Sequence, residues 1–252
     1  MRIISWNVNG LRSIYQKGFL DWFNKTNSDI VCLQEIKANI NQVPFELTQP
    51  DSYHLYFNCA KKKGYSGMII YSKKKALKCT KKLGLDRFDD EGRLLELNFP
   101  RFTLINLYLP HGKRDKSDLN YKLKVYKKLI NRLEKMKNKN LILIGDFNIA
   151  HTEIDLARPS QNKNNIMFTQ TERNQINKML GLGFVDTFRK FNKKSGNYTW
   201  WPYFANARAR DLGWRIDYCF VSQKLTAKLK NAFILKNVPG SDHCPIGIEI
   251  KI

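Results

Sequence analysis

The sequence predicts an α/β protein of the α+β kind, in which packed, mostly antiparallel β-sheets are flanked by helices. Three observations support this: strand-like apolar runs recur from end to end, helical patterns are fewer, and the two do not alternate one for one. Regular alternation would instead favour a parallel sheet wound with helices. No stretch of the 252 residues reads as a linker or a fixed-period repeat, so we expect one domain over residues 1–252.

Eight apolar runs of strand length carry the sheet prediction. In chain order they are Ile3–Val8, Ile30–Leu33, Met68–Tyr71, Leu94–Leu97, Phe102–Leu109, Leu141–Ile144, Ile216–Val221 and Ile246–Ile250. They are spread along the whole chain, which indicates that the sheets are assembled from both halves of the sequence.

Two helices are expected between these runs. The first has lysines interleaved with apolar residues spaced 4-3-4-3, and Asp118 can cap its start; its apolar residues are Leu119, Leu123, Tyr126, Ile130 and Leu133. The second begins at Thr169-Gln170-Thr171-Glu172, a capping-box pattern, and ends at Gly181 or Gly183. It places Ile176, Met179 and Leu180 on one face.

Composition limits the classes of partner. Lys and Arg number 44 against 22 Asp and Glu, a net charge of +22, so an acidic polymer or an anionic membrane surface is the expected partner unless the charge reflects a general richness in lysine. No run approaches the roughly 18 apolar residues of a membrane span. The five cysteines are odd in number and form no C-x-x-C pair, which disfavours a disulfide framework or zinc site. The start of the chain lacks a signal-peptide pattern, so we expect a cytoplasmic protein.

Several apolar runs end in acidic or amide residues. Asn7 follows the first run, Glu35 the second and Asp146 and Asn148 the sixth, while Asp242-His243 precede the last run. Each alone is typical of a turn. Together they match the needs of phosphodiester hydrolysis: Glu35 as an oxygen ligand for Mg²⁺, Asp146 as a base for water, Asn7 and Asn148 as orienting groups, and His243 as a donor to phosphate.

Asp217 lies inside a strand pattern, where an unpaired carboxylate is costly. An orienting contact with His243 would remove that cost, and an ion pair with a nearby arginine would do so equally well. The sequence has no Ser-His-Asp elbow, Walker loop or G-x-G-x-x-G motif, which argues against acyl transfer and nucleotide-dependent kinase chemistry.

Five blocks of the sequence resemble the signatures of the exonuclease III family of AP endonucleases, within the endonuclease/exonuclease/phosphatase fold. They occur in family order and span nearly the whole chain: Ser5-Trp6-Asn7-Val8-Asn9-Gly10-Leu11-Arg12, Leu33-Gln34-Glu35-Ile36-Lys37, Gly145-Asp146-Phe147-Asn148, Trp214-Arg215-Ile216-Asp217-Tyr218 and Gly240-Ser241-Asp242-His243-Cys244-Pro245. The resemblance implies a four-layered αββα sandwich of the DNase I-like type, with the active site at one edge of the two sheets.

The resemblance also implies roles for individual residues. Asp146 falls at the family's base, Asn148 at its transition-state orienter, and Asp217 and His243 at its coupled pair, while Tyr108 matches a tyrosine that contacts the scissile phosphate. The metal residues that the resemblance implies are Asn7, Glu35, Asp146, Asn148, Asp242 and His243; the expected cation is Mg²⁺, with Mn²⁺ as a substitute.

Aromatic residues gather between Tyr198 and Trp214, beside Arg208, Arg210 and Arg215. Aromatic residues at this density most often belong to a protein core, but in a basic protein they also suit a pocket for a flipped nucleotide. The resemblance assigns Trp200, Trp214 and Ile216 to the apolar pocket for the abasic sugar, and places Asn162 and Asn165 near the DNA. Arg114 follows the Tyr108 block on an expected loop that could enter a groove, and Arg208 is a second candidate for a DNA contact.

Two positions depart from the family pattern. Position 9 is Asn where the mammalian enzymes carry Asp, which puts metal affinity and any second ion in doubt. Position 111 is His where Asn or Gln is more usual, beside the expected DNA-facing loop, where it can tune the balance of endonuclease and exonuclease activity.

The resemblance implies a DNA-repair phosphodiesterase that incises 5′ to abasic sites, repairs blocked 3′ ends and has 3′→5′ exonuclease activity. Its expected partner is duplex DNA with abasic sites or blocked 3′ ends, and the protein is expected to act as a monomer away from membranes. The alternatives are the same fold acting on inositol phosphates or sphingomyelin, which the charge and the arginine-flanked aromatics disfavour, and a nucleic-acid-binding protein with a degenerate site.

Overall fold

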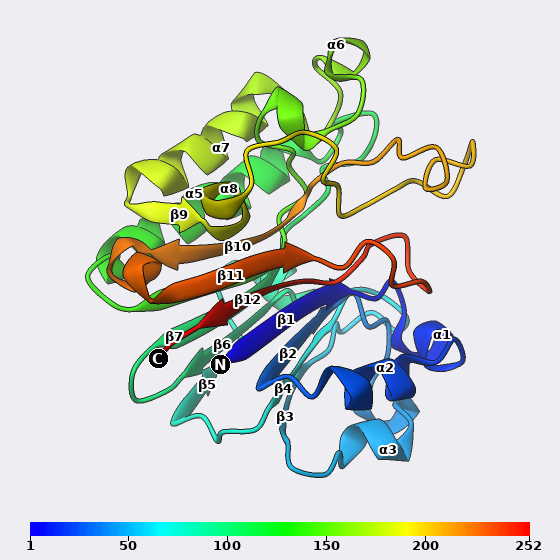
Figure 1. The fold of residues 1–252 in the computed structure, drawn as a ribbon, viewed down its shortest axis with the longest axis vertical. Coiled ribbons are helices and arrows are strands. Elements are labelled where there is room, and N and C mark those ends of the chain that lie inside the picture. Colours follow the sequence, from blue (N-terminus) through cyan, green and yellow to red (C-terminus); the bar gives the residue numbers. More distant parts are fainter.

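The computed structural model describes residues 1–252, and two six-stranded sheets packed face to face form its centre (Figure 1). The first sheet has the order β11 (Leu229–Ile234), β12 (Ile246–Ile250), β1 (Arg2–Asn7), β2 (Ile30–Gln34), β4 (Met68–Ser72) and β3 (His54–Asn58). The second has the order β5 (Lys78–Thr80), β6 (Leu94–Asn98), β7 (Thr103–Tyr108), β8 (Leu141–Asp146), β10 (Asp217–Ser222) and β9 (Phe184–Asp186).

Both sheets are mixed but mostly antiparallel. Only β1 and β2 pair in parallel in the first sheet, and only β7 and β8 in the second. The eight predicted strands are all present, and the prediction of largely antiparallel sheets is confirmed. The four strands that were not predicted, β3, β5, β9 and β11, are the four edge strands of the two sheets. Edge strands are half exposed and short or polar, so their apolar signal is weak.

Helices cover the outer face of each sheet (Figure 1). The first sheet carries α1 (Leu11–Tyr15), α2 (Phe19–Thr26) and α3 (Phe45–Thr48), and the second carries α4 (Asp86–Asp90), α5 (Leu119–Met136) and α7 (Gln170–Gly181). The short α6 (Pro159–Asn162) belongs to a long loop, and α8 (Thr187–Phe191) packs beside β10 and β11. Single 3₁₀ turns occur at Ile40–Gln42, Glu153–Asp155 and Gln223–Lys228.

The apolar core lies in three layers, which confirms the four-layered sandwich. Twenty buried residues fill the space between the sheets, and separate clusters fill each helix–sheet interface. Successive residues of one strand serve different layers: Cys32 faces the other sheet, whereas Val31 and Leu33 face α1 and α2. Because both faces of the central strands are buried, these strands read as continuous apolar runs.

Both predicted helices are present, and α7 (Gln170–Gly181) follows its prediction more closely than α5 (Leu119–Met136). The capping box of α7 is present, with Thr169 accepting from the Glu172 amide, and the helix ends at Gly181. Asp118 stands at the N-cap of α5 but does not cap it, because its carboxylate pairs with Arg87. The buried face of α5 is rotated from the predicted stripe and consists of Lys122, Val125, Tyr126, Leu129 and Leu133.

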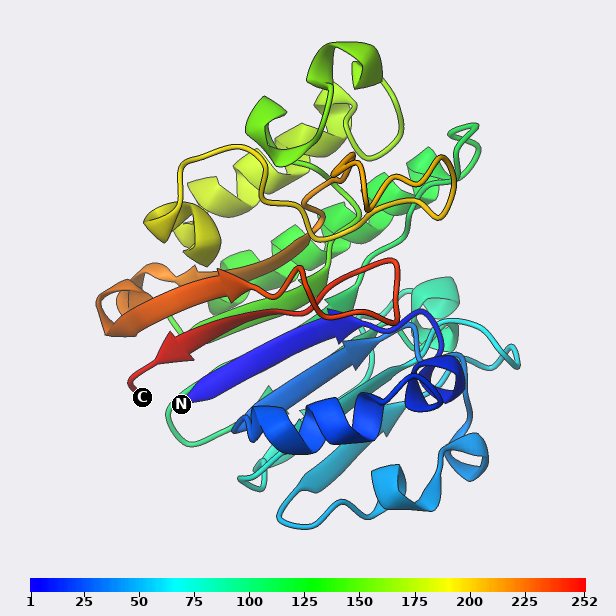
Figure 2. The ribbon, with the colours of Figure 1, turned by 45° about the vertical axis from the view of Figure 1, so that its right-hand side comes forward.

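The two chain termini lie together at one end of the sheets, because β1 pairs with β12 (Figure 2). The loops that follow β1, β2 and β8 lie at the opposite end. No helix is both long and apolar enough to cross a membrane.

Candidate active site

Strand ends from both sheets bring the predicted polar residues together. In the first sheet, the parallel pairing of β1 and β2 sets Asn7 beside Gln34, so the next residue, Glu35, emerges at the same edge. In the second sheet, Asp146 at the end of β8 lies opposite Asp217 at the start of β10 and beside Tyr108 of β7. Sheet register alone therefore places these residues at one end of the sandwich.

A buried polar cluster joins the two sheets at this edge. Nδ2 of Asn7 donates to Oδ2 of Asp146 over 2.9 Å. Nδ1 of His243 lies 2.8 Å from Oδ2 of Asp217, and its Nε2 lies 3.8 Å from Oδ2 of Asp146. All four side chains are buried. Asp217 thus lies against His243 and not against an arginine, and the histidine ring is held between two carboxylates.

The cluster shifts the ionisation of its members in opposite ways. Burial, assisted by the charge of Asp217, raises the pKa of Asp146 to about 7. Burial lowers the pKa of His243, but the charge and hydrogen bond of Asp217, together with the charges of Asp146 and Asp242, outweigh burial and raise that pKa to about 10. Asp146 can therefore exchange a proton near neutral pH, while His243 remains a protonated donor.

Asn148 is fixed by three bonds in a left-handed backbone conformation, with φ of 51°. Its amide N–H donates to Oδ1 of Asp146 over 2.8 Å, and its Nδ2 donates to the Leu109 carbonyl over 2.9 Å. The carbonyl of Asn148 accepts from Nζ of Lys122 over 2.6 Å. These bonds leave Oδ1 as the free polar atom of the Asn148 side chain beside Asp146.

Tyr108 lies beneath a buried arginine. The guanidinium of Arg93 stacks over the Tyr108 ring with 4.3 Å to its centroid and donates to the Tyr108 carbonyl. Burial raises the pKa of Tyr108 well above its usual value, with Glu35 adding to the rise. The phenol therefore stays protonated at neutral pH and can donate a hydrogen bond.

Oxygen atoms near Glu35 form a site that suits a hard cation. Oε1 of Glu35 lies 3.0 Å from Nζ of Lys37, and the same ammonium group contacts Oδ1 of Asn9. Asn9 also donates through Nδ2 to Oδ1 of Asp242, over 2.9 Å. Carboxylate and amide oxygens thus already converge on a positive charge at this point, and they are the donor types that Mg²⁺ prefers.

Three residues of the predicted metal-contacting set hold other partners. Nδ2 of Asn7 donates to Glu35 and Asp146, and its Oδ1 accepts from the Asn9 amide, so Asn7 links the two carboxylates. Nδ2 of Asn148 faces a carbonyl, and both nitrogens of His243 face carboxylates. The side chains of Asp146, Asp217 and His243 offer ligand atoms within 4.8 Å of one another, so they form a second group of possible ligands, which Asn7 joins to Glu35.

An apolar-walled pocket opens beside this cluster. Its volume is about 480 Å³, and its lining includes Trp200, Trp214, His111, Arg114, Asn162 and Asn165. Nε1 of Trp200 donates to Oδ2 of Asp242 over 3.0 Å, and the ring of Trp200 lies 6.4 Å from that of His243. Trp200 therefore lies between the pocket and the polar cluster and is the wall that faces both.

Two predicted binding residues lie elsewhere than expected. Ile216 is buried behind Trp214 in a small apolar cluster and does not line the pocket. Arg208 stacks over Trp201 and donates to the carbonyls of Ser241, Lys236 and Val238. The guanidinium of Arg208 therefore holds the segment before Asp242 in place of the predicted contact with DNA.

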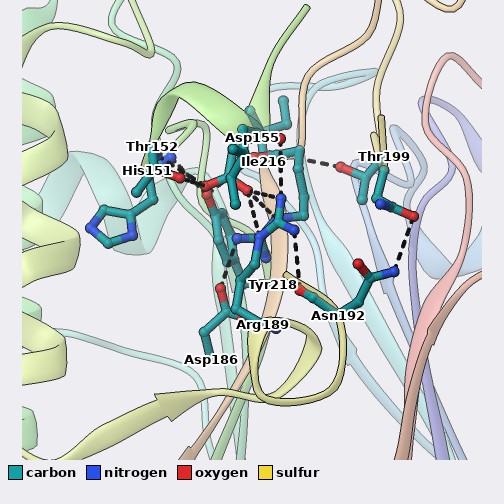
Figure 3. A network of polar contacts seen from close by, with 12 residues as sticks. His151, Thr152, Asp155, Asp186, Arg189, Asn192, Thr199, Ile216 and Tyr218 are labelled. Carbon is teal, nitrogen blue, oxygen red and sulfur yellow. Dashed lines mark hydrogen bonds and ion pairs between the residues drawn. The ribbon is translucent and has the colours of Figure 1, made fainter. Parts of the chain in front are cut away.

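A second buried network anchors the start of β10 (Figure 3). Oδ1 of Asp155 accepts from Arg189 and from Nε of Arg215, and Arg215 also pairs with Asp186 over 2.7 Å. At the first residue of β10, the amide of Asp217 donates to the hydroxyl of Thr199, which lies on a neighbouring loop. These bonds fix the backbone on both sides of Ile216 and thereby the position of Asp217.

Several site residues carry no signal that sequence reasoning could isolate. They are Arg93, Lys37, Met167, Phe204 and the ion pair of Lys122 with Glu172. Lysines and arginines are so frequent in this chain that a buried one does not stand out. Glu172 was found as part of the capping box and Lys37 as part of a family block, but nothing in the sequence indicated the partners that they contact.

Comparison with known proteins identifies relatives over the whole chain. Residues 4–243 match the model of the Endonuclease/Exonuclease/phosphatase family. The chain is 42% identical to the exodeoxyribonuclease of Bacillus subtilis, with 100% of both chains covered. It is 38% identical to the DNA repair nuclease APEX1 of Danio rerio, with 100% of this chain and 83% of the relative covered.

Comparison with solved structures supports the same family. An AP endonuclease from Archaeoglobus fulgidus superposes with a TM-score of 0.91 at 28% identity, and the 3′ phosphatase NExo from Neisseria, bound to a product DNA hairpin, with 0.91 at 27%. Each comparison covers 100% of both chains. The chain is therefore a hydrolytic nuclease that belongs to the Endonuclease/Exonuclease/phosphatase family, among the exonuclease III and AP endonuclease proteins.

Proposed function

We propose that this protein is a Mg²⁺-dependent DNA-repair phosphodiesterase that incises duplex DNA 5′ to abasic sites. The observation that carries the proposal is the position of Trp200, which lines the pocket and donates to Asp242 beside the Asp146–His243–Asp217 cluster. A hydrolytic cluster beside an apolar pocket suits a sugar that lacks a base, because such a nucleotide is flipped out at low cost. The net charge of +22 supports DNA as the substrate over a small phosphorylated headgroup.

The residues of the cluster have complementary tasks. Asp146, with a pKa near 7, accepts the proton of the attacking water, while Oδ1 of Asn148 orients that water. Protonated His243, held by Asp217, donates to a phosphoryl oxygen, and the Tyr108 phenol donates to another. Each donor thus faces charge that develops in the transition state.

Glu35 and Asp242 are the residues that would hold the cation, with Asn9 supplying an amide oxygen. A bound Mg²⁺ or Mn²⁺ would supply charge stabilisation at the phosphate and leaving oxygen. Because Lys37 already contacts Glu35 and Asn9, its ammonium group would move aside when the metal binds.

The same site supports removal of blocked 3′ ends and 3′→5′ exonuclease cleavage. Both reactions attack a phosphate at the Asp146 cluster, and neither needs a sugar in the pocket of Trp200. We also propose that the protein acts as a monomer and as a single catalytic domain, since one chain supplies the whole cluster and the pocket.

Product mapping tests the proposal. End-labelled duplexes that carry an abasic site, a 3′-phosphate or a recessed normal end are incubated with the protein in Mg²⁺, beside inositol phosphate as a control substrate. We expect incision 5′ to the abasic site, leaving a 3′-hydroxyl and a 5′-deoxyribose-phosphate end. Release of phosphate from the inositol compound without DNA cleavage would contradict the proposal.

A further inference from the structure

A completely buried ion pair lies behind the candidate active site, outside the cluster described above. Nζ of Lys122 on α5 lies 2.5 Å from Oε1 of Glu172 on α7, and neither side chain has any exposed surface. Lysine and glutamate are rarely buried to this extent, because removing both charges from water costs more than their attraction returns in most proteins. The other lysines of α5 face solvent or lie at its margin, so Lys122 requires a specific reason.

The side-chain hydrogen bonds of the pair reach three loops beside the site, and Glu172 also closes the capping box of α7. The ammonium group of Lys122 has three protons, and it donates to the carbonyls of His111, over 3.0 Å, and Asn148, over 2.6 Å, as well as to Glu172. Glu172 accepts from the amides of Met167, over 3.0 Å, and Thr169, over 3.1 Å, and from the Thr169 hydroxyl. The pair therefore ties together the three segments that carry these residues.

Two of the backbone groups held in this way belong to residues in the left-handed conformation. Asn148 and Met167 have φ of 51° and 69°, a region that asparagine tolerates but methionine rarely adopts. The two segments are also joined directly, because the Ala150 amide donates to the Met167 carbonyl over 2.8 Å. One of them carries the residue beside Asp146, and the other lines the pocket with His111.

We propose that Lys122 and Glu172 are positioning residues, which hold Asn148 and the pocket wall at Met167 in the conformations that hydrolysis and damage recognition require. The ion pair couples the two halves of the site, since one ammonium group binds the segment of Asn148 and its partner carboxylate binds the segment of Met167. This inference rests on the proposed function for its choice of substrate.

The test compares Lys122→Met with the parent on the abasic duplex and on the 3′-phosphate duplex. We expect kcat for abasic incision to fall about 10- to 100-fold, the usual effect of removing a group that orients a reacting residue, with KM changed by only a few-fold. Removal of the 3′-phosphate should fall less, because it depends on Asn148 but not on the pocket wall. Amide hydrogen exchange should accelerate at Ala150 and Met167.

Arg132→Met provides the matched control on the same helix. Arg132 pairs with Glu96 over 2.5 Å but touches no loop of the site, so its loss should leave both activities and the exchange rates within about two-fold of the parent. The double variant Lys122→Met/Glu172→Gln leaves no unpaired charge behind and should fold where the single variant does not. We expect it to show the same loss of kcat as Lys122→Met, because the pair acts as a unit.

Activities are normalised to the folded fraction measured by circular dichroism. Two results for a folded Lys122→Met protein would overturn the proposal. One is a kcat within three-fold of the parent, and the other is an equal loss of kcat on the two substrates with unchanged amide exchange. Failure of both the single and the double variant to fold would also overturn it, since the pair would then serve folding alone. If the parent itself does not incise the abasic duplex, the proposed function fails instead, and the exchange measurement still decides whether the pair holds the two loops.

Discussion

The catalytic cluster and the pocket wall are built by different means, although they lie side by side. Asp146 and Asp217 occupy strand ends whose register is fixed by the sheet, and their neighbour His243 is buried between them. The pocket is walled by three loops, around residues 111–114, 162–168 and 200–214, whose backbones are held by side chains such as Glu172.

This difference indicates where each property of the protein is encoded. A cluster on strand ends is rigid because breaking it requires breaking the sheet, so it suits chemistry that needs fixed distances. Loops held by a few side-chain bonds can change without loss of the fold, so they suit the selection of substrates. Variants of the cluster should therefore affect rate, and variants of the wall should affect which DNA is cut.

The largest effect is expected for Asp146→Asn. Loss of the base should lower the single-turnover cleavage rate roughly 10²- to 10⁴-fold, while affinity for abasic DNA stays within a few-fold of the parent. Asp118→Asn is the control, since Asp118 pairs with Arg87 away from the cluster. An Asp146→Asn protein that cleaves nearly as fast as the parent would remove Asp146 from the role of base.

A smaller effect is expected for Glu35→Ala, through the metal. The variant should need about 10- to 100-fold more Mg²⁺ for half-maximal activity, because one oxygen ligand is lost. Glu134→Ala, which removes an exposed carboxylate of α5, should leave the metal titration unchanged. EDTA should abolish cleavage by the parent, and activity that survives in chelator would be incompatible with the mechanism.

The dependence of kcat/KM on pH should be bell-shaped. Asp146 must be deprotonated, and its pKa of about 7 means that the rate falls about ten-fold per unit as pH drops below that value, unless a bound cation moves this limb lower. His243 must be protonated, and its pKa of about 10 sets the alkaline limb. Asp217→Asn should move the alkaline limb to lower pH, because the Asp217 charge is the main influence that raises the pKa of His243. An unmoved alkaline limb would mean that His243 does not control it.

The smallest effects should separate the pocket from the charged surface. Arg114→Ala should weaken binding of abasic and intact duplexes alike and reduce the log–log salt slope by about 0.9, the value for one phosphate contact. Trp200→Ala should leave the slope unchanged and lower the preference for abasic over intact DNA. Lys135→Ala, on the exposed face of α5, should change neither. Equal losses on both duplexes for Trp200→Ala would show that Trp200 is not part of a damage-selective pocket.

The central strands and the candidate catalytic residues could be predicted from the sequence. Strands buried on both faces, such as β2 and β8, appear as continuous apolar runs, and the polar residues that end them stand out by contrast. The edge strands β3, β5, β9 and β11 could not be found, because residues that are half exposed lack that contrast. The central strands alone were enough to predict the fold class.

Only the tertiary structure decided which role each polar residue has, because residues of the same type make different contacts. Asn7 faces carboxylates as a donor, Arg208 holds backbone carbonyls, Asp118 pairs with Arg87, and Lys122 is buried while most lysines of its helix are exposed. The sequence determined the apolar pattern and the chemical groups at its ends, because burial acts through the periodicity of each strand. Partners that lie far apart in the chain, such as Lys122 and Glu172, depend on how loops converge, and no local pattern records that convergence.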